Sequence, residues 1–302
     1  MQKDDSILIH PGFPKCASTF LQKKIFSVHP EIDYIGPELF TNRGFNGLFM
    51  NIPTADYDPV RVRALFSSAA AARVLSVETL VGDPYFNPMA GELYAKRLKE
   101  TFPNAKILLI IRSQADVLES LILQWVKTGW TGKMGINDFF KPKRFYTETY
   151  TFDLSYFKYS GIIALYRHYF GKDNVKILGF EKFTENIPAG VKQIFEFMNL
   201  EVPDIINTVP VKRRMTLAGY LFMRYVNRYR TGKFNLKGGV LDIVPWVCIM
   251  RVRNALDKLS RSTGVSKSYT WMTDTFRRDL EAYYREDNDV TRHLIGEDTL
   301  CF

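Results

Sequence analysis

Apolar and polar residues alternate along the first two thirds of the chain in blocks that predict strands followed by helices. Short apolar runs typical of buried parallel strands are expected at residues 6–10, 73–77, 106–111 and 175–179. Helical spacing of apolar residues is found at residues 18–28, 88–101, 115–126, 160–170 and 189–198. Strands that alternate with helices predict an α/β fold with a doubly wound parallel sheet.

The pattern changes after residue 207. Basic amphipathic helices are expected at 217–229 and 247–259, on either side of a turn at Gly238 and Gly239. We therefore expect a single domain over residues 1–302 with a helical insertion or lid at 207–264. That insertion could also be an acceptor platform, a weak contact with a membrane surface, or ordinary helices packed on the core, which is the simplest interpretation.

The charge of the chain narrows the classes of partner. Its formal net charge is +9, with basic residues that recur at several places rather than in one tract. This excess favours an anionic partner such as a nucleotide, an acidic glycan, a lipid surface or a nucleic acid. A solvated basic surface would explain the charge alone equally well.

The three cysteines, Cys16, Cys248 and Cys301, are sparse and lack metal-binding spacing. Neither a disulfide framework nor a zinc site is expected, and no metal is implied. The apolar stretch at the start is too short for a signal peptide, and the run at 239–250 is interrupted by Asp242 and Pro245. We expect a cytoplasmic protein.

The segment Pro14-Lys15-Cys16-Ala17-Ser18-Thr19-Phe20 follows the first predicted strand and opens a helix. Free N–H groups at a helix start bind phosphate, small side chains let the backbone approach the anion, and Lys15 adds a positive charge. The segment is not a Walker A loop, because the Gly-x-x-x-x-Gly-Lys pattern is missing. A turn with an incidental lysine would have the same sequence.

A second candidate begins where the strand at 106–111 ends. Arg112 follows this strand directly, and Ser120 comes two helical turns later. Ligands of open parallel sheets bind beyond the carboxyl ends of the strands, where an arginine suits phosphate. Alternatively, Arg112 pairs with a carboxylate such as Glu119 or Asp116.

Together these two segments resemble the sulfotransferase family, with its loop for the 5′-phosphosulfate near the N-terminus and an Arg-x7-Ser site for the 3′-phosphate. The resemblance implies a P-loop-like three-layer sandwich. It implies 3′-phosphoadenosine 5′-phosphosulfate (PAPS) as donor, the bisphosphate PAP as product, and no metal. Residues 178–200 and the tail at 284–294 are similar to later segments of the family.

The resemblance assigns roles within the loop. Lys15 would contact the bridging oxygen of the donor, and Ser18 and Thr19 its 5′-phosphate. Cys16 and Ala17 stand where the family commonly has Ser or Thr and Gly, and both are small enough to keep the cradle. Phe20 would stack on adenine or belong to the core.

Sulfuryl transfer is an in-line displacement that needs a base for the acceptor proton. The spacing from His29-Pro30 to Glu38 resembles the heparan-modifying branch, which makes Glu38 the first choice. Glu78, within a segment similar to another part of that branch, is the second. His10, at the mouth of the first strand, is the third, although a histidine there is more often structural.

Arg214 ends the basic run 212–214, close to where family members close a loop over the 3′-phosphate; a solvated basic run is the alternative. The acceptor is expected to offer a hydroxyl or amine on a carbohydrate or small molecule. Aromatic residues would line its pocket or fill the core: Trp125, Trp130, Tyr146, Tyr150 and Tyr156.

Three other functions fit parts of the sequence. A P-loop kinase would need the missing Walker A loop. A basic nucleotide- or nucleic-acid-binding protein without transferase activity would show salt-dependent binding, although no nucleic-acid partner is expected. A relative that binds the nucleotide without turnover would fit the altered loop.

Overall fold

The computed structural model describes residues 7–42, 44–66, 72–84, 90–129, 140, 143–145, 148–150, 152–202, 214–231, 239–265, 268–296 and 300–302. The chain divides into two compact units. The first comprises Met1–Gln114, Asp153–Asn207 and Tyr283–Phe302, and the second comprises Ala115–Phe152 and Thr208–Ala282. The described parts of the predicted insertion at 207–264 belong to the second unit.

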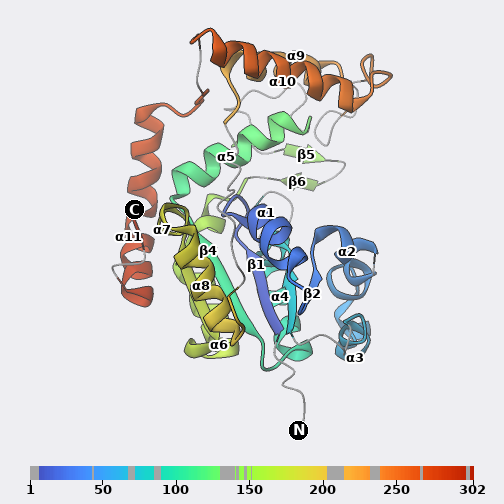
Figure 1. Cartoon of the computed structure of the whole chain (residues 1–302), viewed down its shortest axis with the longest axis vertical. Helices are drawn as coiled ribbons and strands as arrows, with labels where there is room; N and C mark the ends of the chain where they lie inside the picture. Colours follow the sequence, from blue (N-terminus) through green and yellow to red (C-terminus); the bar gives the residue numbers. More distant parts are fainter. Residues whose placement is uncertain are drawn as a thin grey trace. The chain divides into compact units, whose positions relative to one another are not determined.

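A five-stranded parallel sheet forms the centre of the first unit (Figure 1). Its order is β2-β3-β1-β4-β7, with β1 at Ile7–Gly12, β2 at Ile32–Ile35, β3 at Ala72–Ser76, β4 at Lys106–Ile111 and β7 at Val175–Gly179. The four predicted strands and the predicted α/β class are confirmed. β2 was not predicted.

Helical segments connect these strands and cover both faces of the sheet. α4 and α6 pack against each other on one face, and α1 and α8 lie on the other (Figure 1). The longer helices are α4 (Ala90–Thr101), α6 (Tyr159–Phe170) and α8 (Ile187–Met198). The shorter ones are α1 (Ser18–Phe20), η1 (Leu21–Ile25), η2 (Phe26–Val28), α2 (Pro37–Asn42), η3 (Asn46–Met50), η4 (Thr54–Asp56), α3 (Pro59–Arg63), η5 (Glu78–Val81), η7 (Leu154–Phe157), η8 (Lys172–Asn174) and α7 (Phe180–Glu185).

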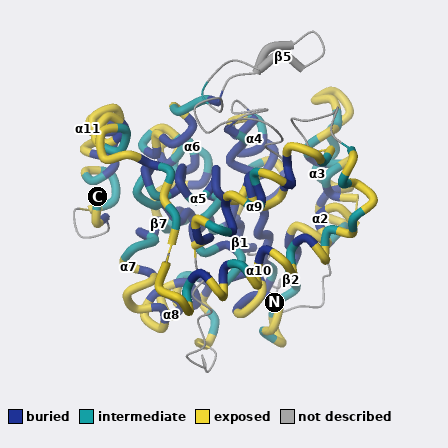
Figure 2. The backbone as a smooth tube through the Cα atoms, turned by 90° about the horizontal axis from the view of Figure 1, so that it is seen from above, coloured by how far each residue is buried: buried dark blue, intermediate teal, exposed yellow. Residues whose placement is uncertain are grey.

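The central strands are buried because helices cover both faces (Figure 2). In β4 every residue after Lys106 is buried, as its continuous apolar sequence predicts. The turn η5 is packed tightly between β1 and α4. A Cβ atom on Gly12 would lie 2.5 Å from Cγ2 of Val81, and one on Gly91 would lie 2.5 Å from the Val81 carbonyl oxygen. Only glycine permits this approach.

The second unit is mainly helical. It contains most of α5 (Gln114–Lys127), the hairpin of β5 (Lys143–Phe145) and β6 (Glu148–Tyr150), α9 (Leu217–Arg228), α10 (Trp246–Ser262) and the first part of α11 (Asp274–Ile295). The two predicted basic helices correspond to α9 and α10. Their apolar faces form one core cluster with α5: Leu123, Val126, Met215, Tyr220, Met223, Val226 and Ile249. Within the described ranges, no helix is both long and apolar enough to cross a membrane.

Candidate active site

The turn after β1 forms a compact loop over residues 13–19. The Phe13 amide donates to the Ile110 carbonyl oxygen of β4 at 3.2 Å, which fixes the start of the loop to the sheet. Lys15 and Ala17 have left-handed backbones, with φ of 67° and 63°. Left-handed residues in a turn are a feature of backbone nests that bind anions, and they are rare outside glycine because the Cβ atom crowds the carbonyl.

Side chains inside the loop hold its shape. Cys16 is fully buried, and its sulfur donates to the Pro14 carbonyl oxygen at 3.5 Å. The Ser18 hydroxyl is also buried and donates to the Phe13 carbonyl oxygen at 3.4 Å. Lys15 and Thr19 are only partly buried. The structure thus uses the Ser18 hydroxyl to close the loop.

Arg112 lies against this loop. Its Nη1 donates to the Lys15 carbonyl oxygen at 3.2 Å, and its guanidinium carbon lies 4.4 Å from the centre of the Phe180 ring. Its own carbonyl oxygen accepts from the Tyr159 hydroxyl at 2.7 Å. The sequence-predicted cations of the loop and of the β4 end are therefore brought together at the carboxyl edge of the sheet.

A carboxylate lies beside them at the end of β7. Glu181 accepts from the Ser113 amide at 3.1 Å through one oxygen. Its other oxygen, like Nε of Arg112, is buried without a hydrogen-bond partner among the described residues. Buried polar atoms of this kind need a partner, so the site has capacity for a polar ligand.

Phe20 follows the loop on the side of β7. Its ring is partly exposed and meets the ring of Phe183 edge to face, with centroids 6.2 Å apart. The ring thus packs on α7 with part of its surface accessible.

A hydrogen-bonded chain runs from the interior to Glu78. His10 Nδ1 and the Ser76 hydroxyl are 2.8 Å apart. Gln22 Nε2 donates to the Ser76 hydroxyl at 3.2 Å, to the Ser76 carbonyl oxygen at 3.1 Å and to a Glu78 carboxylate oxygen at 3.5 Å. Because Gln22 lies on the helical segment that follows the loop, this chain ties Glu78 to the loop.

His10 itself is fully buried, and this burial lowers its pKa to about 4. Removing an imidazole from water disfavours its charged form. His10 Nε2 has no partner among the described groups. His10 is therefore a neutral interior residue at neutral pH, out of reach of solvent in this structure.

The two carboxylates predicted as bases both lie near Tyr34. Burial raises the pKa of the Tyr34 phenol, and the negative charges of Glu78 and Glu38 raise it further. Tyr34 is packed so closely on Gly36 that a Cβ atom there would collide with its hydroxyl. Glu38 is exposed in the first turn of α2, whereas Glu78 is partly buried at the end of β3.

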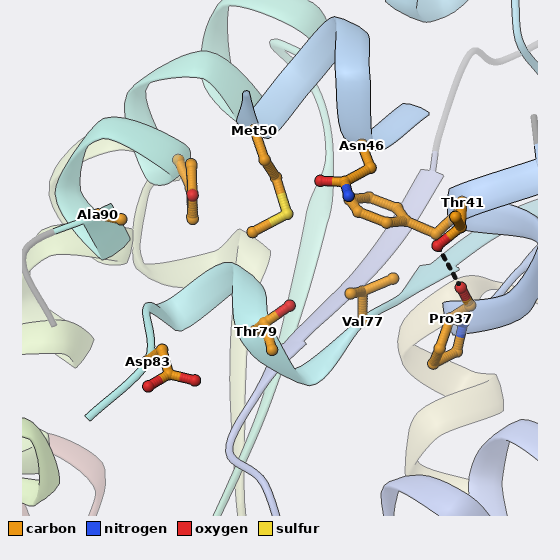
Figure 3. Close-up of a pocket in the computed structure, with 10 residues that line it drawn as sticks. Pro37, Thr41, Asn46, Met50, Val77, Thr79, Asp83 and Ala90 are labelled. Atoms are coloured by element: carbon orange, nitrogen blue, oxygen red, sulfur yellow. Dashed lines mark hydrogen bonds between the residues drawn. The ribbon is translucent and has the colours of Figure 1, made fainter. Parts of the chain in front are cut away.

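A pocket of about 340 Å³ opens beside these carboxylates (Figure 3). Val77 and Thr79, the neighbours of Glu78, form one wall, and Pro37, which precedes Glu38, forms part of another. Met50 and Thr79 point toward each other across it. The described lining is Pro37, Phe40, Thr41, Asn46, Met50, Val77, Thr79, Asp83, Ala90 and Tyr94.

Four charged groups of the site influence the pKa of the buried Cys16 thiol. Burial is the main cause that raises the pKa of this thiol; the charges of Arg112 and Lys15 lower it, and those of Glu181 and Glu78 raise it. Such effects fall off with distance. Of these groups, Lys15 belongs to the loop itself, and Arg112 contacts it through the Lys15 carbonyl oxygen.

Comparison with known proteins decides the family. The model of the sulfotransferase domain matches residues 4–213, more than half of the chain. The chain belongs to the sulfotransferase family. It is an enzyme of that family, whose members use PAPS as donor.

Two solved structures of sulfotransferases are similar to this chain. One, from Alicyclobacillus acidocaldarius, is 18% identical, with 80% of this chain and 98% of that chain covered and a TM-score of 0.46. The other is mouse sulfotransferase SULT7A1 complexed with PAP, 12% identical, with 97% of this chain and 89% of that chain covered and a TM-score of 0.44. No curated protein matches the sequence.

Two predicted donor-binding residues of the sulfotransferase belong to the second unit. Ser120 lies partly exposed on α5. Arg214 is ion-paired with Glu119 at 2.9 Å, and Arg277 with Asp116 at 3.0 Å. The carboxylates considered as partners of Arg112 thus hold other arginines, and the roles of Ser120 and Arg214 stay predictions.

The aromatic residues considered for the acceptor have mixed positions. Trp125 is buried in the second unit and Tyr156 in the first. Trp130 and Tyr146 lie outside the described residues, as do the side chain of Tyr150 and the residues preceding Arg214 in its basic run. The pocket beside Glu78 was not expected from these aromatic residues.

Several site residues were not predicted from the sequence. Gln22 comes one helical turn after Ser18, a spacing that could have placed it beside the loop. Ser76 precedes Glu78 by two residues, so both point to the same side of an extended chain. Phe180 and Glu181 lie in the segment 178–200 that resembles the family, but their place beside Arg112 follows only once β7 is known to pair with β4. Among the described residues, no cluster of histidine, cysteine, aspartate or glutamate suits a metal ion.

Proposed function

We propose that this protein transfers a sulfuryl group from PAPS to a hydroxyl or amine of a small-molecule or carbohydrate acceptor, by in-line displacement with a carboxylate base. The observation that carries the proposal is the contact of Arg112 with the Lys15 loop, together with Glu78, which Gln22 ties to the helical segment that follows this loop. This grouping supplies cations for a phosphosulfate and a base for an acceptor at one edge of the sheet.

The residues of the loop fit the donor. PAPS, when bound, supplies the sulfuryl group and a phosphate leaving group. The left-handed turns at Lys15 and Ala17 support binding of its 5′ end by backbone N–H groups. The ammonium of Lys15 would balance charge on the leaving phosphate, and Thr19 would help to position it. Cys16, which is buried, would support the loop from the protein interior and would not contact the donor.

Arg112 would hold the phosphate at the other end of the nucleotide, together with Ser120. Its guanidinium is already oriented by the Lys15 carbonyl oxygen and the Phe180 ring. The unpaired buried Nε atom supports a further hydrogen bond to a ligand. Phe20, with its partly exposed ring, is proposed to stack on adenine. Arg214 is proposed as a further cation for the same phosphate.

For the base we now favour Glu78 over Glu38. Glu78 accepts a hydrogen bond from Gln22, which lies on the helical segment that follows the loop, and this contact supports its choice as the base. Glu38 is exposed in the first turn of α2, and no hydrogen bond to the loop is seen for it among the described residues. Burial of His10 argues against direct proton abstraction by its ring, since a base must reach the acceptor proton.

The pocket beside Glu78 is proposed to receive the acceptor. Its described lining combines apolar residues such as Phe40, Met50 and Val77 with one carboxylate, Asp83, and contains no lysine or arginine. Anionic groups are recognised by arginine and lysine, which this lining does not offer. The pocket therefore favours a neutral or cationic small molecule over an acidic glycan, although the chain as a whole is basic.

The sparse, unpaired cysteines support a reducing compartment, and we propose the cytoplasm.

The test combines donor binding with transfer. Calorimetry with PAP should show a single site, and incubation with sulfur-labelled PAPS and paired acceptors should label a neutral phenol or alcohol rather than its carboxylated analogue. Lys15→Ala should abolish transfer, whereas Lys24→Ala, an exposed lysine on the next helical segment, should not. Transfer that survives in Lys15→Ala would refute the proposed site; transfer to carboxylated acceptors alone would refute only the acceptor class.

A further inference from the structure

Almost all of the net charge of the protein is concentrated in one segment. Residues 214–265 contain ten lysines and arginines and two aspartates, a net of +8, while the whole chain carries +9. The rest of the chain is therefore close to neutral. Such a concentration points to a function of this segment beyond its packing.

Both aspartates of this segment are used inside it. Asp257 accepts from the Thr216 amide at 2.9 Å and pairs with Arg253 at 3.1 Å. Asp242 accepts from the Thr231 amide at 3.0 Å and pairs with Arg230 at 3.8 Å. The outward faces of α9 and α10 consequently present no carboxylate among their described residues.

The outward face of α10 is apolar as well as basic. One face of this helix packs on the core cluster through Ile249. On the opposite face Val247 is 55% exposed, and Arg251 and Lys258 are exposed beside it. Val252 and Leu259 lie along the flank of the helix and are 48% and 61% exposed. An ordinary surface helix places polar residues there, because exposed apolar area is unfavourable in water.

α9 repeats this arrangement. Leu217, Leu221 and Tyr225 follow each other at four-residue spacing, so they form one stripe along the helix. They are 44%, 56% and 63% exposed. α9 and α10 pack against each other.

The turn before α10 is firmly hydrogen-bonded and presents two aliphatic side chains to solvent. Arg230 Nη1 donates to the carbonyl oxygens of Leu241 at 2.9 Å and Val244 at 2.6 Å, and both of these residues pack on the core cluster. Ile243, between these two residues, is 87% exposed, and Val240, just before Leu241, is 76% exposed. Leu241 and Val244 thus fix the turn to the core cluster, while Val240 and Ile243 are left free to insert into an apolar phase.

We propose that Val240, Ile243 and the outward face of α10 dock the protein on the surface of an anionic membrane. The two aliphatic side chains of the turn would enter the acyl boundary, and Arg251 and Lys258 would lie at the level of the headgroups. Lipid phosphates and carboxylates would neutralise the positive segment. The docking lies on the surface of a bilayer and does not cross it.

The chemistry of the face favours lipid over other anionic partners. The exposed apolar side chains of the turn and of α10 are aliphatic and do not stack on bases, whereas single-stranded nucleic acids are bound by stacking on aromatic residues beside arginine and lysine. A second copy of this chain would bring its own concentrated positive charge to the contact, which opposes association of like faces.

Cosedimentation with vesicles tests the proposal on the full-length protein. Wild type should bind vesicles that contain phosphatidylglycerol, bind pure phosphatidylcholine vesicles weakly, and lose binding as salt rises. The double variant Val240→Ser with Ile243→Ser should weaken binding by about tenfold or more. Arg251→Glu with Lys258→Glu should abolish the preference for anionic lipid.

A matched control lies in the first unit. Val28 and Val60 are exposed by 65% and 64%, so Val28→Ser with Val60→Ser removes the same chemistry elsewhere and should bind like wild type. PAP affinity and thermal unfolding should be unchanged in all variants, which separates this test from that of the proposed function. Binding of wild type to duplex or single-stranded nucleic acid in place of vesicles, a dimer that the serine variants dissociate, or equal vesicle binding by wild type and the Val240 and Ile243 variant would each overturn the proposal.

Discussion

Arg112 donates a hydrogen bond from Nη1 to the main-chain oxygen of Lys15, 3.2 Å away and 97 residues earlier in the chain. This bond connects the end of β4 to the loop after β1. It satisfies a carbonyl group in a left-handed turn and orients the guanidinium at the same time. The position of the arginine and the shape of the loop therefore depend on each other.

Removal of this guanidinium should weaken donor binding. For Arg112→Ala we expect PAP affinity to fall by about tenfold to a hundredfold, the range for a lost charge-assisted hydrogen bond. Arg112→Lys should give an intermediate affinity, because it keeps the charge and loses the planar fork. Calorimetry with PAP measures both. Arg61→Ala, an exposed arginine in the last turn of α3, is the control, and an affinity of Arg112→Ala equal to this control would exclude contact with the donor.

Removal of the catalytic base should lower the turnover number and leave the affinity for the donor nearly unchanged. We expect Glu78→Gln to lower the turnover number by about a hundredfold or more, since general base catalysis contributes this much. PAP affinity should change little. Glu38→Gln serves as the matched variant, because it removes the other carboxylate near Tyr34. A larger loss in Glu38→Gln than in Glu78→Gln would assign the base to Glu38.

The left-handed backbone at Ala17 should be improved by glycine. Ala17→Gly is expected to raise the free energy of unfolding by about 0.5 to 1 kcal/mol, because relief of the Cβ crowding exceeds the entropy that glycine adds to the unfolded chain. Ala64→Gly is the opposite case, because Ala64 has a right-handed helical backbone with φ of −63°. That variant should lose a similar amount. Chemical denaturation of both variants would show the contrast, and a destabilised Ala17→Gly would argue that the crowding is already relaxed.

The three thiols should differ in reactivity. Burial raises the pKa of Cys16, which keeps it protonated and inaccessible, whereas Cys248 and Cys301 are exposed. A thiol reagent should therefore modify two groups in the native protein near neutral pH and a third only after unfolding. Mass spectrometry of the labelled peptides identifies them. Rapid native labelling of Cys16 would show that the loop opens.

His10 should make the protein sensitive to acid. Its pKa is about 4 in the folded state, compared with 6.5 for an ordinary histidine, so the unfolded state binds more protons between these values. Stability is thus intact above about pH 6.5 and falls as the pH decreases, by about 2 kcal/mol at pH 5. His10→Asn should remove this part of the loss, and His293→Asn, an exposed histidine on α11, should not. The measurement is the free energy of unfolding from denaturation curves above pH 6.5 and at pH 5.

The sequence was sufficient for the parts of the fold that depend on local pattern. The run at 106–111 predicts a central strand because only a strand covered on both faces is apolar throughout. β2 was missed because it is an edge strand of mostly half-buried residues, including Asp33, and such a segment has no distinct pattern. Residues 18–28 were predicted as one helix and form α-helical, π-helical and 3-10 turns in succession.

The site was predictable where a residue directly follows a recognisable strand, and not where its partners are known only once the strands pair. Lys15 and Arg112 each follow a recognisable strand, so their place at the sheet edge could be inferred. Gln22 and Ser76 lie on separate elements, and their polar side chains gain a meaning only when β1 and β3 pair. The cavity beside Glu78 likewise depends on how η3, η5 and α4 pack.

Val81 occupies the space that side chains would fill at Gly12 and Gly91. It closes the same short turn that Glu78 opens. The absence of a Cβ atom at Gly12 and at Gly91 therefore sets how closely this turn packs between β1 and α4. Attempts to widen or reshape the neighbouring pocket should therefore leave both glycines alone, since any substitution there would displace the carboxylate before it altered the choice of substrate.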